Sequence, residues 1–368
     1  RHPPRSTLFP YTTLFRSGST GSIGVNALKI AKRFDLSIET LVAGTSIDLL
    51  NEQIAEFKPE RVVVANENDI SKVNHPNVTA GTSAIIKAVE ESSSQVVVNA
   101  LVGFLGLAPT ITAIKHGKTV ALANKESLVV AGEFLDMSKI IPIDSEHFGL
   151  WYLQNDKTIS SMTITASGGS FRDYSPNELE NVTVAQALNH PNWSMGSKIT
   201  IDSATMTNKL FELLEAKWLF DTKKLDAIIE TKSIIHALVN FKDGSTTAHI
   251  ATPNMQLPIA YALLGKVEEE IVPLIDLCEV GSLEFKRIDK AKYPIWELKD
   301  DLLSNPHRGV VVNAANEVGV YRFLKGEIGF LDIAKTTIKS YEKFINVKPS
   351  NIHDIFALDK EVKEFAWQ

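Results

Sequence analysis

Gly18-Ser19-Thr20-Gly21-Ser22-Ile23-Gly24 (GSTGSIG) is the stretch from which the N-terminal part of the fold can be read. Glycines at this spacing permit a tight turn and let a pyrophosphate approach the backbone at the N-terminus of a helix. The residues that follow are apolar at helical spacing: Ile23, Ala27, Ile30, Ala31 and Phe34. Many Gly-rich turns are ordinary loops, so the meaning of this one depends on its neighbours.

Short apolar runs follow the turn, as expected for the strands of an open α/β sheet. We predict strands at Ile38–Val42, Arg61–Ala65, Gln95–Leu101 and Thr119–Ala123, and a helix at Ala108–His116. Asn124, Lys125 and Glu126 follow the last strand, and ligands bind at the carboxyl ends of strands in such sheets. The alternative for Lys125-Glu126 is a solvated helix start.

The segment Gly44-Thr45-Ser46 follows the second predicted strand. NAD-binding versions of this fold place an acidic residue about 20 residues beyond the glycines. Small hydroxyl residues instead leave space and donors for a 2′-phosphate, which favours NADP, although Asp48 lies close by.

Residues 1–17 (RHPPRSTLFPYTTLFRS) hold three prolines and three arginines and lack the apolar run of a signal peptide. We interpret them as a foreign or disordered leader outside the fold. Only Leu14-Phe15 could stand in for the strand expected before Gly18.

The overall composition is that of a globular protein. A length of 368 residues predicts about two to three domains, and hydrophobic and charged contents are 44% and 22%. A net charge of −6 argues against nucleic acid or an anionic membrane surface as a partner. No apolar run approaches the roughly 20 residues that span a bilayer. Cys278 is the single cysteine, which excludes an intrachain disulfide and indicates a reducing compartment.

Asp144-Ser145-Glu146-His147 follows the apolar run Lys139–Ile143. On an extended chain Asp144 and Glu146 face the same way, and two adjacent carboxylates favour a cation between them. Mg²⁺ prefers such oxygen ligands, and Glu212 could supply a third. An exposed acidic loop is the alternative.

The stretch His190–Phe220 combines three predicted parts. Residues 190–196, with Trp193 and Met195 between proline and glycine, resemble a lid that closes over a substrate. A short strand ending at Asp202-Ser203 precedes a helix that Ser203 is expected to cap. Asn208, Lys209 and Glu212 gather on one face of that helix, where they suit a phosphorylated, metal-bound ligand. A capped amphipathic helix with a surface Lys–Glu pair is the alternative.

The C-terminal half carries strand and helix signals. Ser167-Gly168-Gly169 ends a predicted strand and offers a hydroxyl and backbone N–H groups to an anion; a plain turn is the alternative. Ser233–Phe241 and Ser245–Ile250 flank Asp243-Gly244, which is typical of a hairpin in a mixed or antiparallel sheet. A connector is predicted at Val272–Trp296. Helices of a small bundle are predicted at Val310–Leu324, Phe330–Phe344 and Asn351–Ala366.

Taken together, the motifs resemble the 1-deoxy-D-xylulose 5-phosphate reductoisomerase family of the non-mevalonate isoprenoid pathway. The motifs that carry the resemblance run in family order: GSTGSIG, ALANKESLV, PIDSEH, TASGGSFR, HPNWSMG, DSATMTNK, EAKWLF and NAANE (Asn313–Glu317). The resemblance implies an enzyme that uses NADPH and Mg²⁺, Mn²⁺ or Co²⁺ to isomerise and reduce 1-deoxy-D-xylulose 5-phosphate to 2-C-methyl-D-erythritol 4-phosphate. It also implies a homodimer in the bacterial cytoplasm.

The resemblance assigns roles to individual residues. The implied metal ligands are Asp144, Glu146 and Glu212, which with Lys125 form the catalytic set. The implied substrate contacts are Lys125, Ser145, Glu146, Ser167, His190, Ser203, Asn208, Lys209 and Glu212, with Ser167, Ser203, Asn208 and Lys209 on the phosphate. Trp193 and Met195 match the closing flap. The implied NADPH contacts are Thr20, Gly21, Ser22, Ile23, Gly44, Thr45, Ser46, Asn124, Glu126 and Gly196.

The expected fold is α/β, in five segments: a leader (1–17), a Rossmann-like NADPH-binding domain (18–143), an α+β catalytic and metal-binding domain with a mixed sheet (144–268), a connector (269–304) and a C-terminal helical domain (305–368). The chain departs from the family at its first strand, which the leader replaces. Two alternatives therefore remain: another NADP-dependent dehydrogenase acting on a phosphorylated substrate, or a catalytically impaired protein.

Overall fold

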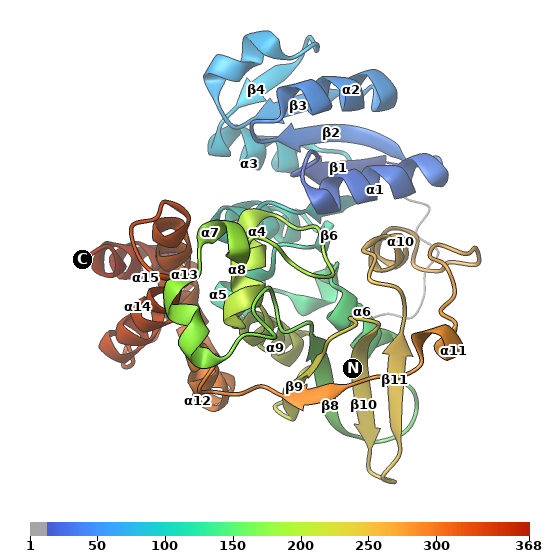
Figure 1. Ribbon diagram of the computed structural model, residues 1–368. Helices are drawn as coiled ribbons and strands as arrows, with labels where there is room; N and C mark the ends of the chain where they lie inside the picture. The colour runs from blue at the N-terminus through green and yellow to red at the C-terminus, as the bar shows by residue number, and fades with distance from the viewer. Residues whose placement is uncertain (1–12) are drawn as a thin grey trace. The chain divides into compact units, whose positions relative to one another are not determined.

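The computed structural model describes residues 13–368, which form two compact units (Figure 1). The first unit contains the described residues up to Ser127 together with Leu135–Asp144 and Asn254–Val272. The second contains Leu128–Phe134, Ser145–Pro253 and Pro273–Gln368. Within the described residues, none of the helices has the length and apolar character needed to cross a membrane.

The first unit is built on a seven-stranded parallel sheet in the order β4-β3-β2-β1-β5-β6-β7. Its strands are β1 (Thr13–Ser17), β2 (Ser37–Ala43), β3 (Arg61–Val64), β4 (Val78–Ala80), β5 (Val96–Asn99), β6 (Thr119–Leu122) and β7 (Ile140–Pro142). Its helices are α1 (Ser22–Arg33), α2 (Ile47–Phe57), α3 (Thr82–Glu91), α4 (Leu107–Lys115) and α10 (Gln256–Leu264), and α5 (Lys125–Ala131) begins in it. This architecture confirms the predicted Rossmann-like fold.

The central strand β1 corrects the interpretation of residues 1–17 as a leader outside the fold. Thr13–Ser17 pair in parallel with β2 on one side and β5 on the other, and Leu14 and Phe15 are buried. The expected first strand is therefore present, although its sequence is unusual because it includes the buried Arg16. Residues 1–12 of the predicted leader lie outside the described residues.

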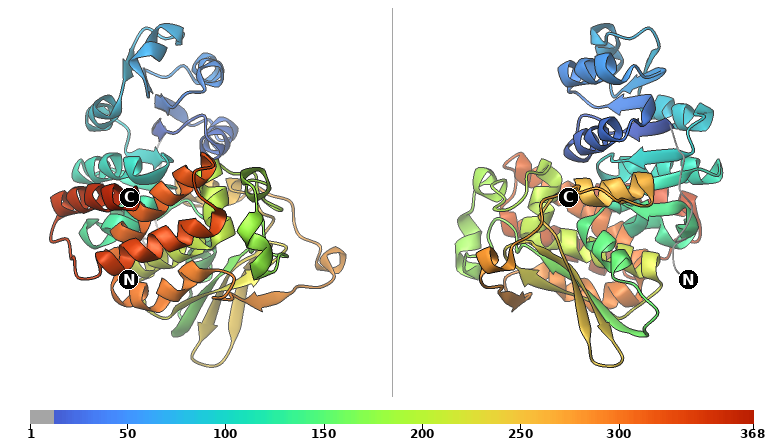
Figure 2. Two further views of the ribbon diagram at one scale, coloured as in Figure 1. Left: turned by 60° about the vertical axis from the view of Figure 1, so that its left-hand side comes forward. Right: turned by 90° about the vertical axis from the view of Figure 1, so that its right-hand side faces the viewer.

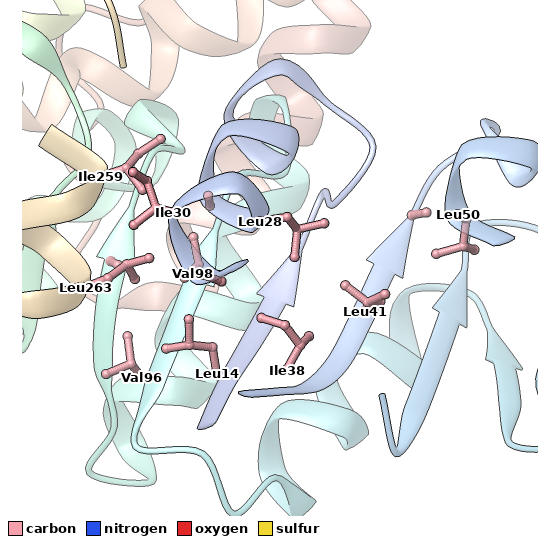
Figure 3. Close-up of a cluster of buried hydrophobic side chains, with 14 of the residues drawn as sticks. Leu14, Leu28, Ile30, Ile38, Leu41, Leu50, Val96, Val98, Ile259 and Leu263 are labelled. Carbon is pink, nitrogen blue, oxygen red and sulfur yellow. The ribbon is translucent and has the colours of Figure 1, made fainter. Parts of the chain in front are cut away.

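The core of the first unit explains why α10 belongs to it (Figure 3). Ile259 and Leu263 of α10 join Leu14, Ile30 and Val98 in one buried apolar cluster. Helix α10 also packs against α1. Residues 254–268 were predicted to lie in the catalytic domain; they pack instead with the first unit, because their apolar face completes the core beneath α1.

The second unit contains a five-stranded mixed sheet in the order β11-β10-β8-β9-β12. Its strands are β8 (Ile159–Ala166), β9 (Leu225–Glu230), β10 (Ile235–Phe241), β11 (Thr246–Ile250) and β12 (Phe285–Arg287). Strands β8 and β9 are parallel and the other pairs are antiparallel, which confirms the mixed sheet and the predicted hairpin. The predicted connector is not wholly irregular, because β12 within it pairs with β9.

The helices of the second unit include the predicted C-terminal bundle. They are α6 (Ser145–Tyr152), α7 (Val184–Ala187), α8 (Ser197–Thr205), α9 (Thr207–Phe220), α11 (Leu277–Val280), α12 (Lys299–Ser304), α13 (Gly309–Leu324), α14 (Phe330–Lys343) and α15 (Ile352–Ala366). Helix α13 packs against both α14 and α15, and the orange-to-red helices lie together in the left-hand view of Figure 2. They form part of the second compact unit.

Two local predictions are wrong, and the first concerns α8. The strand predicted to end at Asp202-Ser203 is this helix, so Ser203 lies inside a helix and does not cap α9. The β-branched residues before Asp202 favour a strand locally, but Ile201 and Ala204 pack into a buried cluster with residues of α13, and tertiary packing overrides propensity. The chain then turns at Met206, whose φ is 70°, before α9 begins.

The second wrong prediction concerns the segment after β7. Helix α6 begins at Ser145, so Glu146 lies in a helical turn and the extended-chain argument for Asp144 and Glu146 does not apply. Their proximity arises instead at the start of this helix.

Candidate functional site

Three carboxylates gather where the sequence predicts a metal site. Asp144 precedes α6, Glu146 lies in the first turn of α6, and Glu212 lies in α9. Each offers one oxygen, and these oxygens lie within 4.8 Å of one another. Glu212 is only 2% exposed. A group of three closely spaced carboxylates has the charge and the oxygen donors that a hard divalent cation requires.

Cationic and amide groups surround these carboxylates. Lys209 Nζ lies 3.6 Å from Glu146 Oε1 and also contacts the Glu212 carboxylate. Asn208 Nδ2 donates to Glu212 Oε1 at 2.5 Å. Lys125 Nζ lies 3.4 Å from Asp144 Oδ2. The predicted face of α9 with an amide, an ammonium and a carboxylate is therefore present. Lys209 and Glu212 are buried and Asn208 is half-buried, so the alternative of a surface Lys–Glu pair does not hold.

Glu146 is held in its charged form. Burial raises the pKa of its carboxyl, but the Lys209 ammonium, the hydrogen bond and charge of His236, and the Ser145 hydroxyl outweigh burial and keep the pKa well below its ordinary value. Ser145 Oγ donates to Glu146 Oε2 at 2.8 Å, and His236 Nδ1 lies 3.9 Å from Glu146 Oε1. A deprotonated carboxylate is the form that binds a metal.

His236 is a site residue that the sequence analysis missed. It lies in β10, and its Nε2 shares a hydrogen bond with the Ala251 carbonyl at 3.1 Å, so Nε2 is the donor. Its ring also lies 6.4 Å from the Trp193 ring, in an edge-on arrangement. No local motif marks this histidine, because its position depends on the pairing of β10 within the sheet.

A second cluster joins Ser167, His190 and Ser203. His190 Nε2 lies 3.0 Å from Ser167 Oγ and 3.3 Å from Ser203 Oγ. His190 Nδ1 accepts hydrogen bonds from the backbone N–H groups of Asn192 and Trp193, so Nε2 carries the proton and faces the two hydroxyls. Ser167 follows β8, and Ser203 lies in α8. These three donors could hold the oxygens of an anion.

His190 is a neutral imidazole at physiological pH. Burial lowers its pKa to about 4, and the charge of Arg172 acts in the same direction. Arg172 Nη1 donates to the Thr231 carbonyl at 2.6 Å, and Asn192 Nδ2 donates to the same carbonyl at 2.8 Å. Arg172 and Asn192 thus fix the start of the predicted lid. Both were quoted in motifs, but nothing in their spacing indicated this shared acceptor.

The remaining lid residues are less enclosed. Trp193 and Met195 are half-buried, and Gly196 is exposed and directly precedes α8. The Gly196 carbonyl accepts from the Thr200 backbone N–H and hydroxyl, so the lid leads into the first turn of α8.

The predicted cofactor residues begin at the Gly-rich turn. A Cβ on Gly24 would lie 2.2 Å from the Gly18 carbonyl oxygen, and Gly18 itself has φ +68° and lies close to Ala100, so the turn requires glycine at both positions. Helix α1 starts after Gly21 without a side-chain cap, and Gly21 and Ser22 are exposed while Thr20 and Ile23 are half-buried. Uncapped N–H groups at a helix N-terminus suit a pyrophosphate.

Two further groups of predicted NADPH contacts follow strands β2 and β6 of the same sheet. Gly44, Thr45 and Ser46 are exposed after β2, with no atom near a Cβ at Gly44. Asn124 is different, because its side chain is used inside the protein. Its Nδ2 donates to the Leu101 and Gly103 carbonyls and to Glu126, and its Oδ1 accepts from Ser127. Asn124 and Glu126 thus join the loops at the strand ends.

Family models match three segments of the chain. "1-Deoxy-D-xylulose 5-phosphate reductoisomerase" matches residues 15–132, its C-terminal domain matches residues 140–220, and "DXP reductoisomerase C-terminal domain" matches residues 250–365.

Curated relatives are similar over nearly the whole chain. The 1-deoxy-D-xylulose 5-phosphate reductoisomerase of Nautilia profundicola is 56% identical over 356 residues, covering 95% of this chain and 97% of the relative. That of Wolinella succinogenes is 52% identical over 352 residues, covering 95% and 98%.

Solved structures have the same fold. A crystal structure of DOX-P reductoisomerase in complex with NADPH, fosmidomycin and magnesium superposes with a TM-score of 0.90 at 32% identity, covering 96% of this chain and 97% of that one. The Zymomonas mobilis enzyme in complex with NADPH gives a TM-score of 0.87 at 33% identity, with coverage of 96% and 98%.

Proposed function

The chain belongs to the 1-deoxy-D-xylulose 5-phosphate reductoisomerase family, and we propose that it converts 1-deoxy-D-xylulose 5-phosphate to 2-C-methyl-D-erythritol 4-phosphate with NADPH and a divalent cation. The substrate skeleton is rearranged to a branched aldehyde, which NADPH reduces while becoming NADP⁺. The observation that carries the proposal is the cluster of Asp144, Glu146 and Glu212 within a chain 56% identical to such an enzyme.

Asp144, Glu146 and Glu212 are the residues that would hold the cation, for which Mg²⁺, Mn²⁺ and Co²⁺ are the candidates. When bound, the cation supplies Lewis-acid polarisation of substrate oxygens. Ser145 and His236 keep Glu146 charged and oriented through the contacts described above. Lys125 lies against Asp144 and is placed to contact the substrate beside the cation.

The substrate phosphate is assigned to the hydroxyls of Ser167 and Ser203, together with Asn208 and Lys209 of α9. His190 supports them as a neutral donor, since its Nε2–H lies between the two hydroxyls. Asn208 and Lys209 contact Glu212 directly, so the same helix face connects the phosphate donors with the metal ligand. Trp193 and Met195 would close over the substrate and exclude water.

NADPH is assigned to the first unit, with its pyrophosphate at the N-terminus of α1 near residues 20–23. The exposed hydroxyls of Thr45 and Ser46 favour the 2′-phosphate of NADPH. Glu126, Asn124 and Gly196 complete the proposed contact set. A preference for NADPH over NADH, measured as the ratio of kcat/KM values, tests the role of residues 44–46.

We also propose a homodimer in the bacterial cytoplasm. Strand β12 lies at an edge of its sheet, and exposed apolar side chains lie on and near it: Leu274, Leu277 and Phe285. The exposed thiol of Cys278 is compatible with a reducing compartment. Light scattering coupled to gel filtration should give twice the 40.5 kDa chain mass, and a monomer mass would contradict the dimer.

The function is tested by following NADPH absorbance with 1-deoxy-D-xylulose 5-phosphate and Mg²⁺. We expect NADPH oxidation that a chelator abolishes and that added Mg²⁺ or Mn²⁺ restores. A panel of other phosphorylated ketoses and aldoses distinguishes this activity from that of another dehydrogenase. Failure to oxidise NADPH with 1-deoxy-D-xylulose 5-phosphate would contradict the proposal.

A further inference from the structure

Asp202 of α8 directly precedes Ser203, one of the proposed phosphate donors, and its side chain is 3% exposed. One oxygen accepts from Asn316 Nδ2 of α13 at 2.7 Å. The other accepts from Lys198 Nζ, one turn earlier in α8, at 2.8 Å. Asn316 is itself fully buried. A buried carboxylate thus joins α8 to the C-terminal bundle at the position beside Ser203.

Two contacts hold α8 from different sides. Consecutive helical residues point about 100° apart, so Asp202 faces α13 while Ser203 faces His190. On the side of the Ser167–Gly169 turn the backbones lie close together, because a Cβ on Gly169 would be 2.7 Å from the Ser203 carbonyl oxygen. Rotation of α8 would break the Asp202–Asn316 hydrogen bond and move the Ser203 hydroxyl away from Ser167 and His190.

We propose that Asn316, acting through Asp202, is a positioning residue that fixes the rotation of α8 and thereby aims Ser203 at the substrate phosphate. The proposal rests on the function proposed above. It gives a role to Asn316 of the Asn313–Glu317 motif, which the metal, phosphate and cofactor sites leave without one. An amide that donates to a buried carboxylate makes a strong, directional hydrogen bond, as this role requires.

Asn316→Ala is the direct test, with Asn313→Ala as its matched control. Asn313 lies one turn earlier in α13 and is equally buried, but its Nδ2 lies 3.5 Å from Glu317 of the same helix. We expect Asn316→Ala to raise the KM for 1-deoxy-D-xylulose 5-phosphate about tenfold, or about 1.4 kcal/mol, with kcat within about twofold and the KM for NADPH unchanged. Asn313→Ala should leave all three constants within about twofold of the wild type.

Asp202→Asn serves as a second variant should Asn316→Ala not fold, because it retains side-chain volume while it removes the charge and replaces one acceptor oxygen with an amide donor. A neutral acceptor makes a weaker hydrogen bond, so we expect the KM for the substrate to rise about threefold. A substrate KM within twofold of the wild type in Asn316→Ala, or in Asp202→Asn if that variant alone folds, would overturn the proposal. An equal rise of KM in Asn316→Ala and Asn313→Ala would do the same, because it would indicate a general loss of packing.

Inorganic phosphate separates this proposal from the proposed reaction, since its binding requires no turnover. We expect phosphate to raise the melting temperature of the wild type and of Asn313→Ala, and to raise that of Asn316→Ala less. If the wild type does not turn over 1-deoxy-D-xylulose 5-phosphate, the reaction is wrong and the phosphate measurement alone decides on positioning. Equal phosphate-induced shifts of the melting temperature in all three proteins would overturn the proposed role of Asn316.

Discussion

Two buried cations, Arg16 in the first unit and Lys209 in the second, lie in opposite kinds of surroundings. Arg16 is fully buried in the central strand β1, and Lys209 is 5% exposed in α9. Lys209 contacts the carboxylates of Glu146 and Glu212. Arg16 Nη1 donates to the carbonyls of Ser17 and Val98, at 2.7 and 3.5 Å. Among residues 13–368, the acceptors of Arg16 are neutral carbonyls, while Lys209 contacts charged carboxylates.

The difference is reflected in the pKa of Arg16. Its Nε and Nη2 have no hydrogen-bond partner among residues 13–368, and burial lowers its pKa to about 9. A buried charge without an opposite charge costs stability, whereas one held by carboxylates and hydrogen bonds is tolerated. The buried charge of Lys209 is therefore compensated, and the buried charge of Arg16 opposes folding.

Glu212→Gln removes one of the two carboxylates that compensate the charge of Lys209, and it should have the largest effect. The amide cannot supply the negative charge that a divalent cation requires, and it leaves Lys209 with one carboxylate fewer. We expect kcat/KM to fall about a thousandfold, roughly 4 kcal/mol, with a higher Mg²⁺ concentration needed for half-maximal activity.

Glu230→Gln is the control for that loss. Glu230 is a fully buried carboxylate of the same unit, but it accepts from the backbone N–H groups of Lys232, Ile234 and Ile235. Its variant should lower stability without changing the Mg²⁺ requirement. If Glu212→Gln retained wild-type turnover at low Mg²⁺, the assignment of the three carboxylates would be wrong.

Arg16→Leu tests whether the buried, uncompensated charge of Arg16 lowers the stability of the first unit. Leucine fits an apolar core position, so we expect the free energy of unfolding to rise by about 2–3 kcal/mol and the melting temperature by roughly 5 °C. The folded-state pKa of about 9 lies below the unfolded-state value, so the penalty is complete below pH 9 and is relieved as the pH rises through and above it. The gain should therefore be complete at pH 7. Calorimetry measures this gain in the unfolding free energy. The unfolding transition of the first unit is identified as the one that NADPH shifts to higher temperature.

Lys118 sharpens that prediction because it is a partnered cation in the same unit. It is 5% exposed, its Nζ donates to the Ser92 and Ser94 carbonyls, and Glu39 attracts it. Lys118→Met should lower the free energy of unfolding by about 1–2 kcal/mol, opposite in sign to Arg16→Leu. Lys32→Leu, at an exposed position, should change it by less than about 0.5 kcal/mol. Destabilisation by Arg16→Leu would contradict the comparison.

The same contrast explains how far the sequence alone could predict this molecule. The parallel strands and the C-terminal helices were recognisable because apolar periodicity and local turns determine them. The three carboxylates were identified through the family resemblance, because the spacing of Asp144 and Glu146 alone left an exposed acidic loop as an alternative. Strand β1 was not recognisable, because a charged residue such as Arg16 argues against a buried central strand until its neighbours β2 and β5 are known.

The remaining errors have the same physical origin. Helix α8 was predicted as a strand because its β-branched residues were read without the packing of Ile201 against α13. His236 was missed because sheet pairing, not a motif, brings it to Glu146. Residues 254–268 were misplaced because the apolar face of α10 does not indicate which core it completes. Each of these three errors concerns a feature that depends on contacts between residues far apart in the chain.

His190 provides the smallest effect and shows that the site also avoids an uncompensated charge. With a folded-state pKa of about 4, below the unfolded-state value, its contribution to stability is complete above about pH 6.5 and is lost as the pH falls toward 4. Burial is the larger cause, so Arg172→Gln should raise this pKa only part of the way toward its ordinary value. Imidazole NMR resonances at pH 5 should show a larger protonated fraction of His190 in the variant.

His249, whose pKa burial and His236 lower to about 4, is the internal control and should not change. An unchanged His190 resonance would show that Arg172 shapes the lid through its hydrogen bond to Thr231 and not through its charge.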